Sequence, residues 1–336
     1  MARHPQSPSG PAGYVAGVDL GGTKVRAALA DLAGHIVAED VLATDPRGGV
    51  AVAAQIDTLL RRLAVRGGVD WSDVRMTAVG LPGAPDPATG TVDLSPNVSD
   101  LGALDVRTEL TRRLGHPVVL DNDVNMAAAG ERWLGSGRTH RHFVFVAVGT
   151  GIGMGIVLDG ELVRGARGAA GEISYLPLGT DPFDPANQVR GALEEAVAGS
   201  ALSGRYQAAT GEQVSVPVVF DRAAAGDQTA RAAIDEEARL IALAVVAITA
   251  VLDPEAVVLG GGIGARVELV EPVRRWVAAL SADLPLIKTS QLGDRAGLLG
   301  AIAVARQQAG AQLDSAARPV AAQLGRNTSY QSAEGR

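Results

Sequence analysis

Two glycine-rich turns are the parts of this sequence best suited to chemistry. The first is Gly21-Gly22-Thr23-Lys24, preceded by Asp19, and the second is Gly149-Thr150-Gly151. Each turn lies between two apolar runs that are typical of strands, so the sequence predicts two strand–turn–strand units and a duplicated core. Because glycine has no Cβ, backbone N–H groups in such turns can approach an anion closely. Two facing turns would clamp a polyphosphate, which predicts an enzyme that handles a nucleoside triphosphate.

The two turns have separate expected roles at the triphosphate. The first turn is expected to cradle phosphate, with Lys24 balancing charge and Asp19 holding Mg²⁺ through water. The second turn is expected to bind the β- and γ-phosphates, with the Thr150 hydroxyl as an added donor. An ordinary hairpin turn is the alternative for either turn alone. The in-strand Asp19 and the matching second unit favour the functional interpretation.

Three consecutive polar residues, Asp121-Asn122-Asp123, come directly after a predicted strand and at the start of a predicted helix. We expect Asp123 to be a general base that takes the proton from a sugar hydroxyl as that oxygen attacks the γ-phosphate. The helix N-terminus is expected to favour the ionised carboxylate. Asn122 is expected to hold neighbouring hydroxyls, and Asp121 to be a capping or structural residue. Capping alone explains one such residue but not three in a row.

Two further motifs leave their interpretation open. Gly260-Gly261-Gly262 follows a predicted strand and precedes a helix, and it suits either a purine or ribose contact or a tight turn. Glu172, in Gly171-Glu172-Ile173, suits either a hydrogen bond to a sugar hydroxyl or an ordinary surface position. The sequence of these two motifs alone does not decide between the alternatives.

Composition excludes several classes of protein. The net charge is −7 and the sequence has no cluster of basic residues, which disfavours nucleic acid as the main partner. There is no cysteine, so disulfides and thiolate metal sites are excluded. No run of residues is long and apolar enough to span a membrane, and the first twelve residues contain no apolar signal segment. We therefore expect a cytoplasmic enzyme.

The predicted organisation is two α/β domains with a cleft between them. The N-terminal domain spans 14–122 and includes a returning helix at 298–310, and the C-terminal domain spans 123–297. Residues 1–13 are expected to form a disordered leader, and 311–336 a disordered tail. Strands at 14–20, 25–30 and 35–42 are expected to form an antiparallel meander, and a long loop is expected at 84–100. Further predicted elements are helices at 50–66, 104–114, 191–202, 229–252, 269–280 and 298–308, and strands at 76–81, 117–120, 256–259 and 285–288.

Together these motifs resemble the ROK family of sugar kinases and sugar-responsive repressors. The resemblance covers roughly residues 14–310. It implies an α/β, two-domain actin-like ATPase fold (ribonuclease H-like, hexokinase-type) with an interdomain cleft. Besides the motifs above, it depends on Pro96-Asn97, Gly168-Ala169-Ala170-Gly171-Glu172-Ile173 and Gly191-Ala192-Leu193-Glu194.

The resemblance also implies roles for particular residues. Asp123 matches the family's catalytic base, and Gly261 and Gly262 match its adenosine contact. The two glycine turns match its phosphate clamps, with ATP and Mg²⁺ as the implied cofactors. The expected reaction transfers the γ-phosphate of ATP to a hexose hydroxyl, usually the 6-hydroxyl. The residues that match its sugar ligands are Asn97, Asn122, Glu172 and Glu194.

The sequence departs from the family pattern at the structural zinc. Relatives bind zinc through a histidine and three cysteines, but here Tyr175 stands at the histidine position and Ala192 replaces one thiolate. We therefore expect no zinc site. The loop Asp181–Pro185 is expected to be ordered by its prolines and one buried aromatic. The lost histidine is also a sugar ligand in the family, so Tyr175 either replaces it through its hydroxyl or simply packs.

Three functions remain as hypotheses. The first is an ATP-dependent kinase of glucose or of an aminohexose such as glucosamine, mannosamine or kanosamine, since an acidic pocket could hold an ammonium group. The second is a sugar-sensing protein derived from a transcriptional regulator, although too few residues precede the first strand for a helix-turn-helix motif. The third is a non-catalytic sugar-binding protein. A homodimer is expected because dimers are common in the family.

Overall fold

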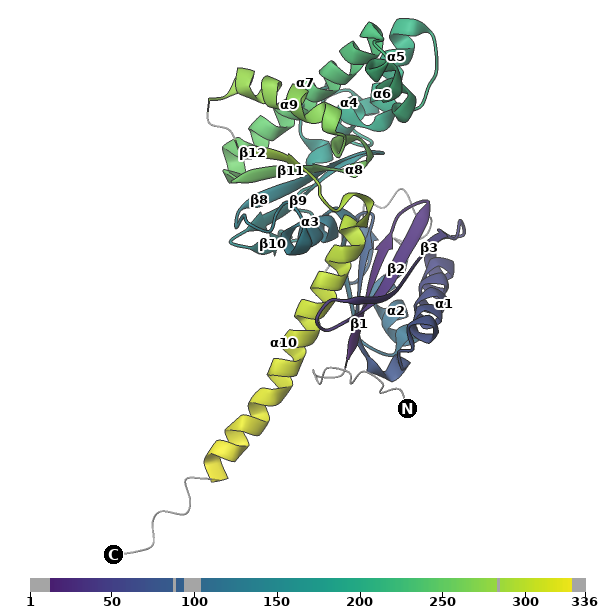
Figure 1. Ribbon diagram of the computed structural model, residues 1–336, viewed down its shortest axis with the longest axis vertical. Coiled ribbons are helices and arrows are strands. Elements are labelled where there is room, and N and C mark those ends of the chain that lie inside the picture. The colour runs from purple at the N-terminus through teal and green to yellow at the C-terminus, as the bar shows by residue number, and fades with distance from the viewer. Residues whose placement is uncertain (1–12, 87–88, 94–103, 283–284, 328–336) are drawn as a thin grey trace, which may run out of the picture.

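The computed structural model describes residues 13–86, 89–93, 104–282 and 285–327 (Figure 1). Its first half contains a five-stranded sheet, in which three strands run parallel and two hairpin-linked strands extend it antiparallel. The predicted antiparallel meander is therefore confirmed. In sheet order, the strands are β3 (Ile36–Ala43), β2 (Lys24–Asp31), β1 (Tyr14–Leu20), β4 (Val74–Leu81) and β7 (Val118–Asn122).

The second half repeats this topology. Its first three strands pair antiparallel through two hairpins, and its last two strands run parallel to the first of the three. Each strand position in one sheet therefore has an equivalent in the other. The hairpins β1–β2 and β8–β9 are thus equivalent, and the predicted duplication is confirmed. In sheet order, the strands are β10 (Glu161–Val163), β9 (Ile152–Leu158), β8 (Phe143–Val148), β11 (Ala256–Gly260) and β12 (Leu286–Thr289).

Amphipathic helices cover the outer face of each sheet. In the first half α1 (Gly49–Gly67) buries Val52, Ile56 and Leu60 against the sheet and ends at Gly68, whose φ of 66° suits only glycine well. The helix α2 (Val106–Leu114) packs beside it. In the second half α7 (Gln228–Leu252) and α9 (Val267–Leu280) lie against each other over the sheet. The remaining outer elements are α4 (Ala192–Val197), α5 (Gly199–Thr210), α6 (Val216–Ala224) and the short α8 (Gly261–Gly264).

The inner helices of the two halves are exchanged. The helix α3 (Asp123–Leu134) follows a strand of the first sheet but packs on β8 and β9 of the second. The helix α10 (Ala296–Asn327) follows the last strand of the second sheet but packs on β1 and β4 of the first. The two helices cross where Gly130 meets Gly300, because a Cβ on Gly300 would lie 1.6 Å from the Met126 carbonyl oxygen. The crossing joins the two halves through backbone contact.

The structure differs from the predicted elements in several places, one of which is the unpredicted helix α6. The helix predicted at 191–202 is two helices, because Ala198 is extended and lets the Gly199 N–H donate to the Gly149 carbonyl (2.8 Å). The described part of the predicted long loop contains a short hairpin of β5 (Ala84–Pro85) and β6 (Val92–Asp93). The helix α10 continues to Asn327, whereas we predicted a disordered tail from 311. Apart from Gly13, the predicted leader 1–13 lies outside the described residues.

No helix in the part of the chain that the structure describes has the length and apolar character needed to cross a membrane.

Candidate active site

Strand register sets the first part of the site. Asp19 on β1 pairs with Gly80 on β4, and Gly80 pairs with Asp121 on β7. The three residues therefore form a row at the carboxyl ends of three parallel strands, the edge at which open α/β sheets bind ligands. Gly80 makes room for the start of α3, because a Cβ there would lie 2.9 Å from the Met126 Cγ. We did not predict this role for Gly80, although an isolated glycine in an apolar strand signals close backbone approach.

The roles of the polar residues Asp121, Asn122 and Asp123 at the start of α3 differ from our prediction. Asn122 is the helix cap, since its Oδ1 accepts hydrogen bonds from the Val124 N–H (2.8 Å) and the Asn125 N–H (3.2 Å). Its Nδ2 donates to the Gly83 carbonyl (3.0 Å). This leaves one Nδ2 hydrogen of Asn122 for the predicted sugar contact, which stays a prediction.

The buried Asp121 carboxylate holds the cap in place. Its Oδ1 accepts from the Asn122 N–H and from Asn125 Nδ2, both at 2.9 Å, and its Oδ2 accepts from Arg164 Nε at 2.7 Å. The predicted structural role of Asp121 agrees with these contacts. Arg164 was not predicted, because it comes from the distant end of β10 and nothing in the local sequence links it to Asp121.

Asp123 occupies the first turn of α3 and its carboxyl group has a strongly raised pKa. Burial, with a further contribution from the nearby Asp19 and Glu172 carboxylates, raises the pKa of Asp123 to about 7. The backbone N–H groups of the first turn act in the opposite direction but do not prevail. Our expectation that the helix N-terminus would favour the ionised form therefore describes only the weaker effect. A pKa near neutrality is typical of a general base.

Asp19 is a second half-buried carboxylate at the site. Burial raises the pKa of Asp19 to about 6, while Arg26 acts to lower it. Its carboxylate makes no hydrogen bond to any residue within the described ranges. The start of α10 approaches it closely, since a Cβ on Gly297 would lie 2.8 Å from the Asp19 Oδ1. A desolvated carboxylate without a direct partner fits a cation ligand, as predicted for Mg²⁺, and binding through water remains a prediction.

Two further carboxylates come from the second half. Burial and the neighbouring Glu194 raise the pKa of Glu172, and burial likewise raises the pKa of Glu194. The Glu194 Oε2 accepts a hydrogen bond from the Ile152 N–H (3.0 Å), directly after the second glycine turn. Asp19, Asp123, Glu172 and Glu194 thus form a chain of interacting carboxylates that includes both halves of the molecule. The sequence motifs named all four but could not show that they interact.

The two glycine turns differ in the contacts that surround them. In the first turn the Gly21 N–H donates to the Lys24 carbonyl (2.9 Å), and the Thr44 hydroxyl donates to the Gly21 carbonyl (2.7 Å), while Gly22 and Thr23 are exposed. In the second turn a Cβ on Gly151 would lie 2.3 Å from the Glu194 Oε2. Both turns leave backbone uncovered, as an anion cradle requires.

The glycine triplet after β11 lies directly against the second turn. A Cβ on Gly260 would clash with the Phe145 ring. Gly261 has a φ of +77°, and a Cβ there would lie 2.4 Å from the Val148 carbonyl oxygen. Gly262 has open space at its Cβ position, and its N–H lies 3.4 Å from the Cβ position of Gly149. Gly260 and Gly261 are therefore required by the turn, and Gly262 is the member left for the predicted adenosine contact.

The region that replaces the zinc motif is more exposed than predicted. Tyr175 is 48% exposed, so its predicted sugar contact remains a prediction. Phe183 is 86% exposed, and the expectation of a buried aromatic in the loop Asp181–Pro185 is therefore wrong. That loop is instead held by local turns in which the Asp184 side chain accepts from the Ala186 N–H. Ala192 is buried at the start of α4.

Two predicted features of the site are not tested by the described residues. Asn97 lies outside the described residues, so its predicted sugar contact is untested. Within the described ranges, no group of three or more His, Cys, Asp or Glu residues is arranged to hold a metal ion. The expectation of no zinc site therefore stays a prediction.

The duplicated sheets, the exchanged helices and the carboxylates gathered from both halves define a two-domain protein of the actin-like ATPase fold. The chain belongs to the ROK family, which matches residues 15–308. It is 30% identical over 317 residues to a glucokinase from Thermotoga maritima, covering 88% of this chain and 98% of that protein.

Solved structures agree with this assignment. A ROK hexokinase from Thermus thermophilus is 32% identical with a TM-score of 0.77, covering 88% of this chain and 98% of that one. A ROK family glucokinase from Streptomyces griseus, solved with glucose and AMPPNP, is 29% identical with a TM-score of 0.73, covering 88% of this chain and all of that one. The predicted hexokinase-type fold and family are confirmed.

Proposed function

We propose that this protein is an ATP-dependent hexose kinase that phosphorylates the 6-hydroxyl of glucose or of an aminohexose. The observation that carries the proposal is the Asp123 carboxyl group, which has a pKa of about 7 and interacts with Asp19 and Glu172. Support also comes from the similarity to glucokinases, one of which binds glucose together with an ATP analogue.

Each group has a definite part in the proposed transfer. Asp123 accepts the proton of the sugar hydroxyl as its oxygen attacks the γ-phosphorus of ATP, whose bond to the bridging oxygen breaks to release ADP. The turns 21–23 and 149–151 hold the triphosphate through backbone N–H groups. Asp19 would hold Mg²⁺ through water, and a bound Mg²⁺ would supply positive charge to offset the charge on the phosphates. Asn97, Asn122, Glu172 and Glu194 orient the sugar.

The charge of the sugar subsite bears on the choice of hexose. Glu172 and Glu194 interact unfavourably, and the nearby Arg190 forms its close contacts with Glu195, at 2.8 and 2.6 Å, rather than with Glu194. Arg190 lies 4.0 Å from Glu194. A protonated amine on the sugar would relieve this repulsion, which supports an aminohexose alongside glucose as the substrate.

A coupled ATP assay over a panel of sugars tests the proposal. We expect turnover with glucose or with glucosamine, mannosamine or kanosamine. If the subsite recognises a protonated amine, N-acetylglucosamine, in which the nitrogen is uncharged, should turn over more slowly than glucosamine. Preference for an amine over glucose identifies an aminohexose kinase, and the reverse identifies a glucokinase. Absence of turnover on every sugar, combined with tight binding of one, would instead favour the sugar-sensing hypothesis.

The pH profile of kcat/KM gives a second test. Because the proposed base acts when deprotonated and its pKa is about 7, we expect kcat/KM to rise with pH through neutrality and then level off. The rising limb belongs to the interacting carboxylates as a group, since Asp19 and Asp123 are coupled. Initial rates at constant ionic strength measure this. A profile that is flat between about pH 6 and 8 would contradict a base with this pKa.

A further inference from the structure

A cavity lies where the exchanged helices meet, away from the carboxylates and the glycine turns. Its volume is about 720 Å³, within the range of small-molecule sites. One wall comes from α3 and β10, and the other comes from α10 and Leu32. None of the predicted site residues lines it. A ligand here would therefore touch both halves of the molecule without entering the proposed active site.

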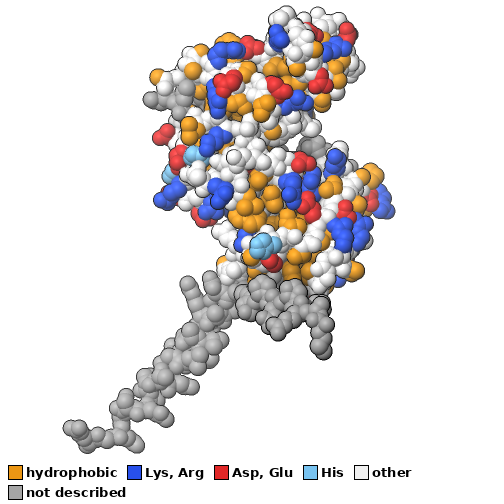
Figure 2. All heavy atoms as spheres, in the orientation of Figure 1, with side chains coloured by type: hydrophobic (Ala, Val, Ile, Leu, Met, Phe, Trp, Pro, Cys, Tyr) orange, Lys and Arg blue, Asp and Glu red, His pale blue; other side chains and the backbone are white. Residues whose placement is uncertain are grey.

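The lining of the cavity has an excess of basic side chains although the chain carries a net charge of −7. Glu161 is the single carboxylate among its lining residues, at 3.7 Å from Arg132. Three more carboxylates contact lining residues: Asp159 lies 3.1 Å from Arg141, Asp121 pairs with Arg164, and Glu255 lies 3.4 Å from His140 and accepts from the Arg141 N–H. The five lining arginines still outnumber these four carboxylates. Figure 2 shows basic and histidine side chains, with acidic ones among them, near the waist of the molecule. The five lining arginines are Arg132, Arg138, Arg141, Arg164 and Arg306.

Two of these arginines are well placed to receive an anion. Within the described residues, the Arg138 guanidinium has no hydrogen bond or ion pair, and its side chain is exposed. The Arg306 guanidinium stacks at 4.8 Å from the centre of the Trp133 ring while its Nε donates to the Leu32 carbonyl (2.9 Å). The stacking holds the planar fork in one orientation, which suits paired hydrogen bonds to phosphate oxygens.

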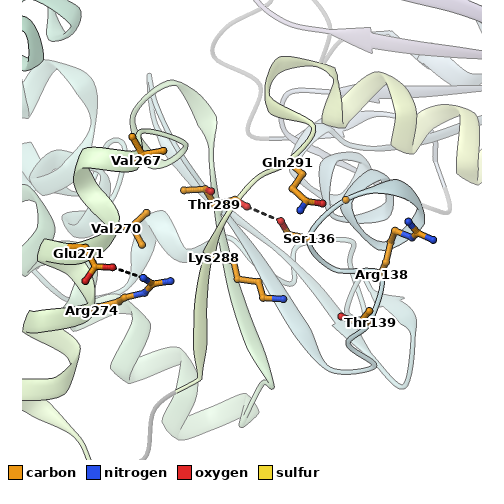
Figure 3. Close-up of a pocket in the computed structure, with 11 residues that line it drawn as sticks. Ser136, Arg138, Thr139, Val267, Val270, Glu271, Arg274, Lys288, Thr289 and Gln291 are labelled. Carbon is orange, nitrogen blue, oxygen red and sulfur yellow. Dashed lines mark hydrogen bonds and ion pairs between the residues drawn. The ribbon is translucent and has the colours of Figure 1, made fainter.

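A neighbouring cavity of about 810 Å³ shares Arg138 and Thr139 and adds another cation. Figure 3 shows the Lys288 side chain directed toward the segment that carries these two residues. The Lys288 ammonium donates to His140 Nε2 at 2.8 Å, which leaves its other two hydrogens available. Only two lysines occur in the whole sequence, Lys288 and Lys24. The segment at 138–141 therefore has Lys288 on one side and the arginines of the first cavity on the other, with Glu255 accepting from the Arg141 N–H (2.9 Å).

We propose that the arginine-lined cavity between α3, β10 and α10 binds the phosphate group of a small phosphorylated metabolite. Arg164 links this cavity to the active site, because the same guanidinium pairs with Asp121 beneath the cap of α3. A phosphate that engages Arg164 competes with Asp121 for it. This proposal goes beyond the kinase reaction and does not depend on it.

Isothermal titration with inorganic pyrophosphate tests the site. The titration is done at constant ionic strength with AMPPNP and glucose at saturating concentration, so that the proposed active site is filled. We expect one pyrophosphate per chain, and at least a roughly 10-fold weaker Kd in the double variant Arg138→Gln/Arg141→Gln, because two charge-assisted contacts are lost. Both side chains are exposed, and unchanged thermal unfolding will show that the variant folds.

A matched control uses Arg47, an exposed arginine paired with Asp45 in a distant loop. Arg47→Gln should leave the pyrophosphate affinity unchanged. If AMPPNP abolishes the pyrophosphate binding, or if Arg138→Gln/Arg141→Gln binds as tightly as the wild type, the proposal is overturned. The comparison of variants requires no turnover, so a failed kinase assay would leave this result interpretable.

Discussion

Replacing Asp123 by asparagine is expected to lower kcat by at least about 100-fold while hexose binding is retained. The amide keeps the size and first-turn position of the carboxyl group but cannot accept the hydroxyl proton. Because we propose that other residues bind the hexose, the dissociation constant of the sugar should change much less than kcat. Initial rates at saturating ATP, together with calorimetric titration of the sugar, separate the two effects.

The same variant should be at least as stable as the wild type above neutral pH. The pKa of Asp123 is about 7 in the folded protein and near 3.8 when unfolded, so the folded state binds more protons between these values. Stability contributed at Asp123 therefore falls as the pH rises through this window, and ionised Asp123 opposes folding above it. Asp123→Asn removes that cost. Thermal unfolding at pH 8 should show an equal or higher Tm.

Asp253→Asn is a suitable control for both measurements. Asp253 is exposed at the end of α7 with a φ of 44°, a conformation that asparagine also tolerates. Its substitution should leave kcat, sugar affinity and Tm unchanged. If Asp123→Asn kept near-normal kcat, Asp123 could not be the base. If it lost sugar binding and stability together, its role would be structural.

The strands and turns of this fold could be predicted from the local sequence. The runs at 14–30 and 143–158 are apolar with glycine between them, and that pattern depends on neighbouring residues alone. The N-terminal edge of α3 was also predictable, since polar caps are local signals. The sequence did not predict which of the three polar residues caps α3, because Asn122 and Asp121 both suit the position. The choice depends on Gly83 and Arg164, which come from other elements.

Features that depend on packing between distant segments were not predictable. The break at Ala198 forms because the Gly199 N–H bonds to the Gly149 carbonyl of another element. The pKa of Asp123 is raised mainly by burial and further by the Asp19 and Glu172 carboxylates. Both effects depend on segments that are distant in the sequence, since Asp19 precedes Asp123 by more than 100 residues. Phe183 looked like a core residue by type, yet its loop lies at the surface. These properties arise from tertiary contacts.

The crossing of α3 and α10 leads to the prediction with the largest effect on stability. Gly300→Ala places a methyl group 1.6 Å from the Met126 carbonyl oxygen and 2.9 Å from the Gly130 nitrogen. Both neighbours are backbone atoms, so the clash is relieved only if the helices separate. We expect a loss of about 3 kcal/mol in the free energy of unfolding, against a gain of about 1 kcal/mol from helix propensity alone.

Gly310→Ala is the matched control, because it makes the same change in the same helix where the Cβ position meets nothing within 4 Å. There only the propensity term acts, so the Tm should rise slightly. For Gly300→Ala the Tm should fall by roughly 6 to 12 °C. Separation of the helices would also move Asp123, which begins α3, relative to Asp19, which α10 approaches at Gly297. A fall in kcat should therefore accompany the lower Tm, and two variants of equal stability would show that the backbones do not meet at this crossing.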